Sequence, residues 1–119
     1  MINAQIQTEQ IEFEDFLKVD IRAGTILAAR LNPKAKKPAY EIDVDFGCDL
    51  GIKKSSAQLI ENYLPEDLIG MQVCAVINFP PRRVADVKSE VLILGIVCSE
   101  NGTVLIQPTK PVKNGERLA

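Results

Sequence analysis

The amino-acid sequence predicts an all-β fold with one inserted helix. Its 119 residues fit a single domain, and at this length a chain with 46% hydrophobic residues can bury a core without disulfides or a bound metal. Short apolar segments, either alternating with polar residues or continuous, are separated by Gly, Pro, Asn and Ser. This is the pattern of strands joined by turns, interrupted once by a segment with helical signals.

The chain begins, after a polar start, with a short predicted helix and a long strand. Phe13, Phe16 and Leu17 recur at i, i+3 and i+4, which makes one apolar face of a helix, and we expect this face to cover the core. Apolar and polar residues then alternate from residue 17 to 31, and the alternation changes phase around Gly24. An isolated glycine in a strand pattern indicates a bulge or bend, so we expect the first strand to turn there.

Residues 40–46 form a second alternating strand. Its apolar positions are Tyr40, Ile42, Val44 and Phe46. Its acidic positions are Glu41, Asp43 and Asp45. Alternate residues line one face of a strand about 6.5 to 7 Å apart, and no nearby residues complete an oxygen cage for a hard cation. We therefore predict a solvated acidic face and no metal site.

Residues 55–70 have the signals of a helix. Ser55 and Gln58 match a capping box, and Pro65 marks the far end. The lysine pair at 53–54 precedes this start, so the free N–H groups of the helix could also attract an anion. Both interpretations, a cap only or a cap with an anion site, remain open at this point.

Two further apolar runs, at 71–79 and 90–98, are typical of strands buried on both faces. A short strand is expected at 51–54 and a last one at 104–108, after an Asn-Gly turn. The helix then lies between the third and fourth strands. That is the arrangement of a five-stranded OB-fold Greek-key barrel, here with terminal extensions.

Composition argues against an enzyme. The chain has no histidine, so the commonest general base and metal ligand are missing. Lys88 and Ser89 are neighbours in a predicted strand and point to opposite faces, which prevents a simple Ser-Lys pair. Cys48, Cys74 and Cys98 have neither disulfide nor zinc spacing and are expected to be reduced and buried. We predict no cofactor, no metal, no membrane insertion and a cytoplasmic location, since the N-terminus has no signal-peptide pattern.

Charge is unevenly distributed. The first 20 residues hold five acidic and one basic side chain, whereas Arg30, Lys34, Lys36 and Lys37 lie close together without an acid. Such a basic patch can attract anions, or it can be an ordinary solvated loop. Aromatic residues are few, so any nucleic-acid binding should depend on charge more than on base stacking.

Four motifs occur in a characteristic order. They are DIRAGTI (20–26), NPKA (32–35), NFPPRR (78–83) and VKSEVLILG (87–95). This set resembles the tRNA-binding domain family, which consists of OB-fold modules that are free-standing or attached to methionyl- and phenylalanyl-tRNA synthetases. More narrowly, DFG (45–47) and GIKKSSAQ (51–58), followed by NFPPRR and KSEVLILG, are similar to the CsaA group. These are dimeric cytoplasmic proteins regarded as export-related chaperones. The resemblance implies an N-terminal extension at 1–12 and a single tRNA-binding-type OB-fold domain at 13–119.

The resemblance also implies a binding face around the NFPPRR elbow. Pro80 and Pro81 fix φ and lack N–H groups, so they should hold the following arginine pair in place on the barrel rim. The arginine fork suits phosphate and carboxylate groups alike. The candidate peptide- or RNA-binding residues are Lys36, Lys37, Tyr40, Asn78, Phe79, Arg82, Arg83, Lys88, Ser89 and Glu90.

Two functions follow as expectations, and one surface could serve both. The first is a homodimeric chaperone that binds unfolded or pre-export polypeptides, and the second is a module that binds tRNA or other RNA through shape and phosphates. A domain that only assembles partner proteins is a third possibility. Val91 and Leu92 replace a Gly-Met pair found in many relatives, which favours a peptide surface. Apolar residues in the terminal segments favour a dimer; they are Ile6, Ile11, Val112 and Leu118.

Overall fold

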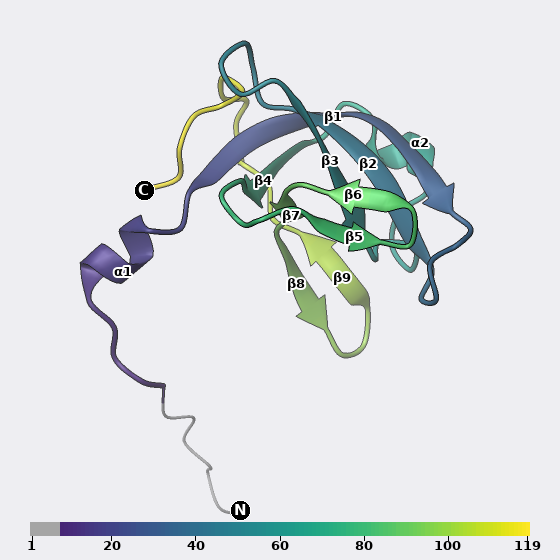
Figure 1. The fold of residues 1–119 in the computed structure, drawn as a ribbon, viewed down its shortest axis with the longest axis horizontal. Coiled ribbons are helices and arrows are strands. Elements are labelled where there is room, and N and C mark those ends of the chain that lie inside the picture. Colours follow the sequence, from purple (N-terminus) through teal and green to yellow (C-terminus); the bar gives the residue numbers. More distant parts are fainter. Residues whose placement is uncertain (1–7) are drawn as a thin grey trace, which may run out of the picture.

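Strands make up most of the regular secondary structure in the computed structural model, which describes residues 8–119 (Figure 1). Its two helices are α1 (Phe13–Leu17) and α2 (Pro65–Leu68). Its strands are β1 (Ile21–Asn32), β2 (Ala39–Asp45), β3 (Ile52–Ala57), β4 (Gln72–Val76), β5 (Arg82–Val84), β6 (Val87–Ser89), β7 (Leu92–Ile93), β8 (Gly95–Cys98) and β9 (Gly102–Leu105).

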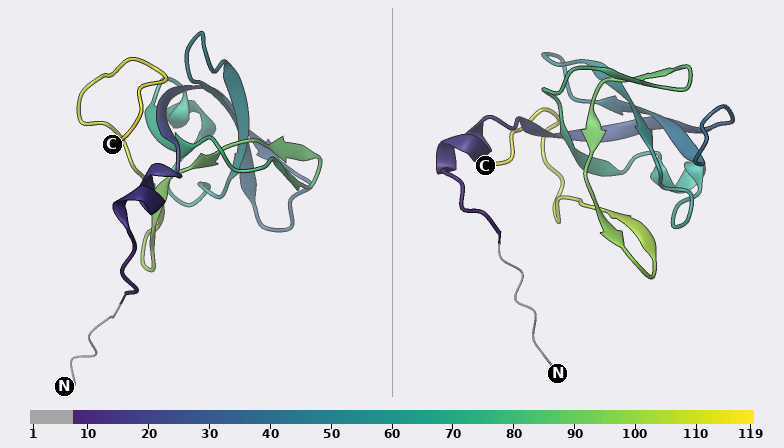
Figure 2. Two further views of the ribbon diagram at one scale, coloured as in Figure 1. Left: turned by 60° about the vertical axis from the view of Figure 1, so that its left-hand side comes forward. Right: turned by 60° about the horizontal axis from the view of Figure 1, so that its bottom comes forward.

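A curled antiparallel sheet of five strands forms the body, in the order β3-β2-β1-β4-β7. The pairs β5–β6 and β8–β9 are separate hairpins. The first hairpin lies across the β3 side of the sheet, and the second projects away from the body in both sets of views (Figures 1 and 2). The predicted fold class is confirmed, with α2 between β3 and β4.

The sheet curls closed where the segment after β6 meets β3. The Glu90 N–H donates to the carbonyl oxygen of Lys54 at 2.8 Å, and the Lys54 N–H donates to the Glu90 carboxylate at 2.9 Å. The Ser56 N–H donates to the Ser89 hydroxyl at 3.1 Å. Side chains thus complete hydrogen bonds that a regular strand pair would make through the backbone, which leaves fewer groups of the β3 edge unpaired.

β1 is the longest strand and pairs with β4 through its first half and with β2 through its second. Gly24 is regularly paired with Val73, and the register shift lies later, between Ile26 and Ala28. The predicted bend is therefore displaced from the glycine. A Cβ on Gly24 would lie 2.6 Å from the Val44 side chain, so glycine is required here by the close approach of the core.

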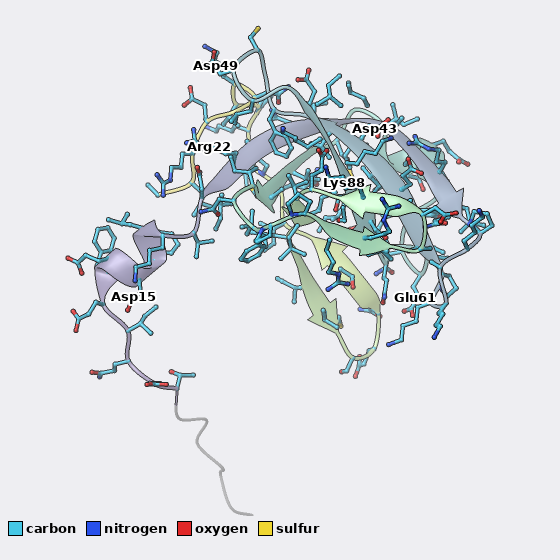
Figure 3. The ribbon with its side chains drawn as sticks, viewed as in Figure 1. Asp15, Arg22, Asp43, Asp49, Glu61 and Lys88 are labelled. Atoms are coloured by element: carbon cyan, nitrogen blue, oxygen red, sulfur yellow. The ribbon has the colours of Figure 1, made fainter. Side chains whose placement is uncertain are left out.

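β2 alternates as predicted. Its apolar side chains, followed by Phe46, are buried in the main core. Glu41 and Asp43 are at the alternate, partly exposed positions on the other face, and Asp43 is labelled in Figure 3. Lys54 approaches both carboxylates, at 2.9 and 3.0 Å, and Arg30 pairs with both as well. Hydrogen bonds from Lys54 and then Arg30 lower the pKa of Glu41. The acidic face is an ion-pair network rather than a freely solvated surface.

The predicted helix at 55–70 is wrong for its first part. Ser55 lies in β3, opposite Ile42 of β2, and only 1% of it is exposed. Pro65 begins the short helix α2 rather than ending a long one, as suits its fixed φ. Pairing with β2 satisfies the backbone of this segment, so tertiary structure overrides the local capping signal, and the proposed anion site at Ser55 does not exist.

The apolar run at 90–98 is not one buried strand. Ile93 is buried next to β4, but the chain leaves the sheet after it, and Val97 in β8 is 82% exposed. β8 pairs with β9, which spans Gly102–Leu105 rather than 104–108. The single apolar run in the sequence therefore covers two different structures. Its first part, up to Ile93, packs in the core, and its second part is a strand of an exposed hairpin.

The N-terminal helix is confirmed, but its covering role is only partly right. Phe16 packs on the small core cluster of Ile21, Cys74 and Val76, whereas Phe13 and Leu17 are exposed. The C-terminal segment runs beside α1 and β1 (Figure 1), and the Leu118 N–H donates to the carbonyl oxygen of Ile21 at 2.8 Å.

The cysteines differ in environment. All three are free thiols; Cys74 is buried, and burial raises its pKa. Cys98 is partly buried and Cys48 is exposed, so the prediction of burial is wrong for Cys48, which lies in the turn before β3. Within residues 8–119 there is no helix long and apolar enough to cross a membrane and no cluster of side chains suited to a metal ion.

Candidate functional site

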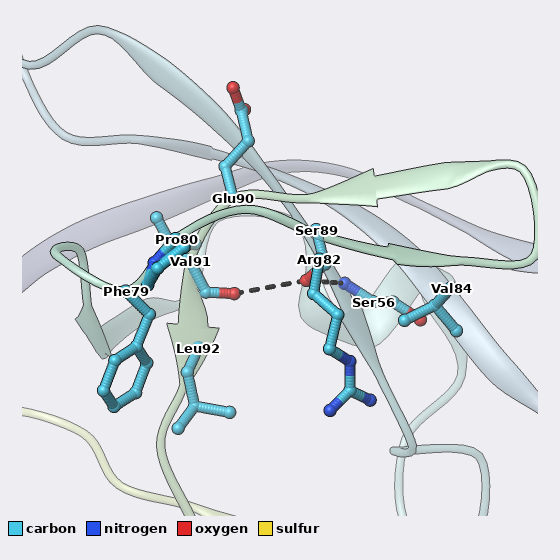
Figure 4. Close-up of a pocket in the computed structure, with 9 residues that line it drawn as sticks. All are labelled: Ser56, Phe79, Pro80, Arg82, Val84, Ser89, Glu90, Val91 and Leu92. Carbon is cyan, nitrogen blue, oxygen red and sulfur yellow. Dashed lines mark hydrogen bonds between the residues drawn. The ribbon is translucent and has the colours of Figure 1, made fainter.

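A pocket of about 360 Å³ lies beneath the β5–β6 hairpin (Figure 4). It is lined by Ser56, Phe79, Pro80, Arg82, Val84, Ser89, Glu90, Val91 and Leu92. Phe79 is 50% exposed and Leu92 48% exposed, whereas Val91 is buried. The floor is therefore packed into the core, and the two large apolar side chains remain free to contact a ligand.

The segment with Pro80 and Pro81 leads directly into β5 and fixes the direction of the side chains around it. Both prolines are exposed, and β5 begins directly after them. The side chains of Phe79, Arg82 and Leu92 project to one side of the ribbon, and Glu90 projects to the other (Figure 4). The carboxylate of Glu90 is held by the Lys54 N–H, so it does not reach into the apolar part of the pocket.

Strand alternation separates the two arginines. Arg82 is opposite Ser89 across the hairpin, and Arg83 is opposite Lys88. Residues that face each other in an antiparallel pair share a face, and successive residues alternate. Arg82 therefore lines the pocket with Ser89, whereas Arg83 and Lys88 lie on the outer face of the hairpin, where both are exposed.

A second pocket, of about 480 Å³, adjoins the first and shares Ser56, Arg82 and Val84 with it. Its remaining lining comes from the loop between β1 and β2 and from neighbouring residues. These are Lys34, Ala35, Lys36, Lys37, Ala39, Gln58 and Ala85. The structure thus brings the loop lysines together with Arg82 around one cavity.

A third pocket, of about 450 Å³, shares Lys37 with the second and reaches the projecting β8–β9 hairpin. It is lined by Lys37, Pro38, Gln58, Ile60, Glu61, Val97, Cys98, Ser99, Gly102 and Thr103. We call the three adjoining pockets the binding groove. The contribution of β8–β9 was missed from the sequence, although Asn101-Gly102 is a hairpin signal that could have indicated a projecting strand pair here.

One cation of the groove is neutralised and the others are not. Lys34 forms an ion pair with Asp86 at the tip of the β5–β6 hairpin, and their hydrogen bond raises the pKa of Lys34 and lowers that of Asp86. Among residues 8–119, Lys36, Lys37 and Arg82 form no ion pair. The centre of the groove therefore carries unbalanced positive charge.

Two predicted site residues have structural positions instead. Tyr40 is only 4% exposed, and its hydroxyl donates to the carbonyl oxygen of Tyr63 at 2.7 Å. Its inclusion in a surface site is wrong, because its place on the alternating strand β2 points it into the core. Asn78 donates to the Lys18 carbonyl oxygen at 2.7 Å and accepts from the Asp20 N–H at 3.0 Å, so its amide anchors the chain before β1.

The sequence and fold agree with those of known proteins. Residues 21–117 match the model of the family described as "Putative tRNA binding domain". The chain is 49% identical to the chaperone CsaA of Bacillus anthracis strain Ames, with a TM-score of 0.88 over 93% of this chain and 100% of that one. For the CsaA chaperone protein of Picrophilus torridus, the identity is 41% and the TM-score 0.87, over 92% and 100% of the chains.

Longer relatives contain a similar segment. The chain is 38% identical over 110 residues to a methionine–tRNA ligase of Porphyromonas gingivalis. That match covers 92% of this chain but only 16% of the ligase, so the chain spans about a sixth of the length of that enzyme. The family match covers most of the described residues and agrees with the fold. The chain belongs to the tRNA-binding domain family.

Proposed function

We propose that this protein binds extended segments of unfolded or pre-export polypeptide in the binding groove and acts as a homodimeric cytoplasmic chaperone. The observation that carries the proposal is the first pocket, where the half-exposed side chains of Phe79 and Leu92 flank a buried floor beside the cation Arg82. Large apolar side chains left in solvent next to a cavity are a common mark of a binding surface.

The chemistry of the pocket suits transient binding. Complete burial of one apolar side chain contributes about 1.5 to 3 kcal/mol, and ordering a flexible segment opposes part of that gain. One or two such contacts with a few polar ones therefore give weak, reversible association. A chaperone that holds unfolded chains and releases them needs affinities of this kind.

The relatives support the same proposal. Two solved structures that resemble this chain over their whole length carry the name chaperone CsaA. The absence of histidine in the sequence supports a protein that works by binding and not by catalysis.

We also propose that the terminal segments contribute to the dimer. Ile11, Val112 and Leu118 are exposed apolar residues, and the C-terminal segment lies beside α1 (Figure 2); Ile6 lies outside the described residues. In a C2 dimer the same patch of each subunit meets its copy. On this proposal residues 1–12 are an extension to the domain of residues 13–119.

Sedimentation equilibrium at micromolar concentration tests the proposed dimer. It should give twice the mass of one chain, and the mass of a single chain would contradict the proposal of a dimer.

Binding of tRNA or other RNA is the second candidate function, and a different observation favours it. Arg83 and Lys88 lie opposite each other on the outer face of the hairpin, and neither forms an ion pair within residues 8–119. A pair of exposed cations at a fixed separation suits backbone phosphates. The family name and the matched ligase support this candidate as well.

The test of the proposed function compares two leucines of similar exposure. Leu92 lines the first pocket, whereas Leu27 lies on β1 and lines none of the three. With a permanently unfolded probe, such as reduced and carboxymethylated α-lactalbumin, Leu92→Ala and Phe79→Ala should each weaken binding about ten-fold in fluorescence anisotropy. Leu27→Ala should not weaken it. Equal binding by the wild type and all three variants would show that the pocket is not the peptide site.

A further inference from the structure

We infer that the binding groove selects polypeptide segments in which an acidic residue is flanked on both sides by apolar residues. The inference rests on the proposed function, because it specifies the class of polypeptide that the groove accepts. It follows from the order of the three pockets and from the different chemistry of their linings.

The first end of the groove is apolar. Its apolar lining consists of Phe79, Pro80, Val84, Val91 and Leu92. The nearest acidic group, Glu90, is hydrogen-bonded to the Lys54 N–H and projects away from Phe79 and Leu92 (Figure 4). This pocket therefore takes an apolar side chain and offers no partner for a basic one.

The centre is cationic. Lys36, Lys37 and Arg82 line the second pocket, and none of them forms an ion pair within the described part of the chain. Of the two carboxylates near this loop, Asp86 is held by Lys34, and Glu61 lies beyond Lys37 in the lining of the third pocket. Three unpaired cations around one cavity are complementary to a carboxylate and repel a lysine or arginine of the ligand.

The far end is mixed but has an exposed apolar wall. Val97 is 82% exposed and lines the third pocket with Ile60 and Pro38. Glu61 also lines it, close to Gly102 of β9. Lys37 reaches this pocket too, and Glu61 offsets its charge here. The pocket therefore has no net attraction for an acidic residue of the ligand, and an apolar one gains contact with Val97. The sequence of preferences along the groove is apolar, acidic, apolar.

Polypeptide fits this order better than RNA. A single-stranded nucleic acid carries a phosphate at every step and binds best to a continuous basic track with aromatic faces. Here a single cationic centre lies between an apolar end and an end that contains the carboxylate of Glu61, and Phe79 is the only aromatic residue in the three linings. Bound RNA would place phosphates near Glu61, where they are repelled.

The experiment uses labelled peptides of about 12 residues, which reach about 40 Å when extended, comparable to the 44 Å length of the molecule. Each has a Gly, Ser and Gln background, two leucines and one central residue, at several spacings. The central residue is Asp, Asn or Lys. Wild-type protein should bind the best Asp peptide about ten-fold more tightly than the matched Lys peptide, with Asn between them.

Charge reversal supplies the matched variants. The double change Lys36→Glu with Lys37→Glu lies in an exposed loop and should invert the preference, so that the Lys peptide binds more tightly. The control, Lys110→Glu with Lys113→Glu, alters two exposed lysines outside all three pockets and should keep the wild-type order. For Val97→Ser, each peptide is also made with its second leucine replaced by serine; the variant should weaken binding of the two-leucine peptide and leave that of the one-leucine peptide unchanged. Sedimentation checks that the oligomeric state of the variant is unchanged.

The outcomes separate the inference from the proposed function. If all peptides with leucines bind equally, whatever their central residue, the inference is wrong and the proposed function stands. If no peptide binds and the unfolded probe does not bind either, both are wrong. If the loop variant loses binding of tRNA while peptides never bind, the groove serves RNA, and the inference is wrong. Inverted preference in the loop variant alone supports the inference.

Discussion

Arg83 and Lys88 face each other across the β5–β6 hairpin, two like charges side by side on an exposed face. Like charges directly opposite in a sheet are destabilising, and opposite charges are favourable by roughly 0.2 to 1 kcal/mol. Asp86, at the hairpin tip, offsets little of this repulsion, because its hydrogen bond is to Lys34. An anion bound from solution between Arg83 and Lys88 would reduce their mutual repulsion.

The first prediction concerns this pair. Lys88→Glu should raise the free energy of unfolding by about 0.5 kcal/mol, because repulsion is replaced by attraction to Arg83. Urea denaturation followed by circular dichroism measures the change. Lys88→Gln is the control: it removes the repulsion without adding an attraction, so its free energy of unfolding should lie between those of the wild type and Lys88→Glu. A lower stability for Lys88→Glu would mean that the repulsion is already neutralised.

Any RNA binding should depend strongly on salt. If each subunit of a dimer neutralises about three phosphates, raising salt from about 50 to 200 mM should weaken binding roughly 300-fold. Arg83→Ala with Lys88→Ala should flatten the slope of affinity against salt, whereas peptide affinity should change little in the same titration. An RNA affinity independent of salt would contradict the assignment of phosphate contacts to the hairpin.

Stability should fall on acidification through Glu41 and Asp43. Hydrogen bonds to Lys54 and Arg30 lower the pKa of Glu41; for Asp43, burial acts in the opposite direction, but the same two cations still lower its pKa. A carboxyl with a lowered folded-state pKa contributes stability that is complete above its unfolded pKa, about 4, and is lost as pH falls through the folded pKa. Unfolding measured from about pH 6 to pH 2 should show this loss.

The variant Glu41→Gln with Asp43→Asn is the control for that titration. It removes the two carboxyls that pair with Lys54 and Arg30, so its stability should depend less on pH below about 4 than that of the wild type. The same slope in both proteins would assign the acid sensitivity to other carboxylates.

The free energy of unfolding should respond in opposite directions when Ser55, in β3, and Ser89, in β6, are each replaced by alanine. Ser55 is buried, and its hydroxyl has no hydrogen-bond partner among the described residues, so Ser55→Ala should leave stability unchanged or raise it by up to about 1 kcal/mol. Ser89 accepts from the Ser56 N–H, and Ser89→Ala should cost about 1 kcal/mol or more. Chemical denaturation of both variants compares them, and a large loss for Ser55→Ala would reveal a partner for its hydroxyl.

Local patterns in the sequence determined the strands that alternate over a long stretch. Tyr40, Ile42, Val44 and Phe46 recur with period 2, and only an amphipathic strand places all of them on one buried face. The short helix at Phe13–Leu17, the position of α2 between β3 and β4, and the exposed elbow before Arg82 follow from similarly local signals.

Only the tertiary structure decided how these elements meet. Ser55 carries a helix-capping signal but lies in β3, because β2 offers its backbone a full set of hydrogen bonds. Strand alternation puts Arg82 and Arg83 on opposite faces, but only the pairing of β5 with β6 and the packing of the hairpin decide that Arg82 is the one that lines the pocket. The groove joins Phe79, Lys36 and Val97 from three distant segments. Contacts of this kind depend on pairing and packing between residues far apart in the chain, and no local period or motif encodes them.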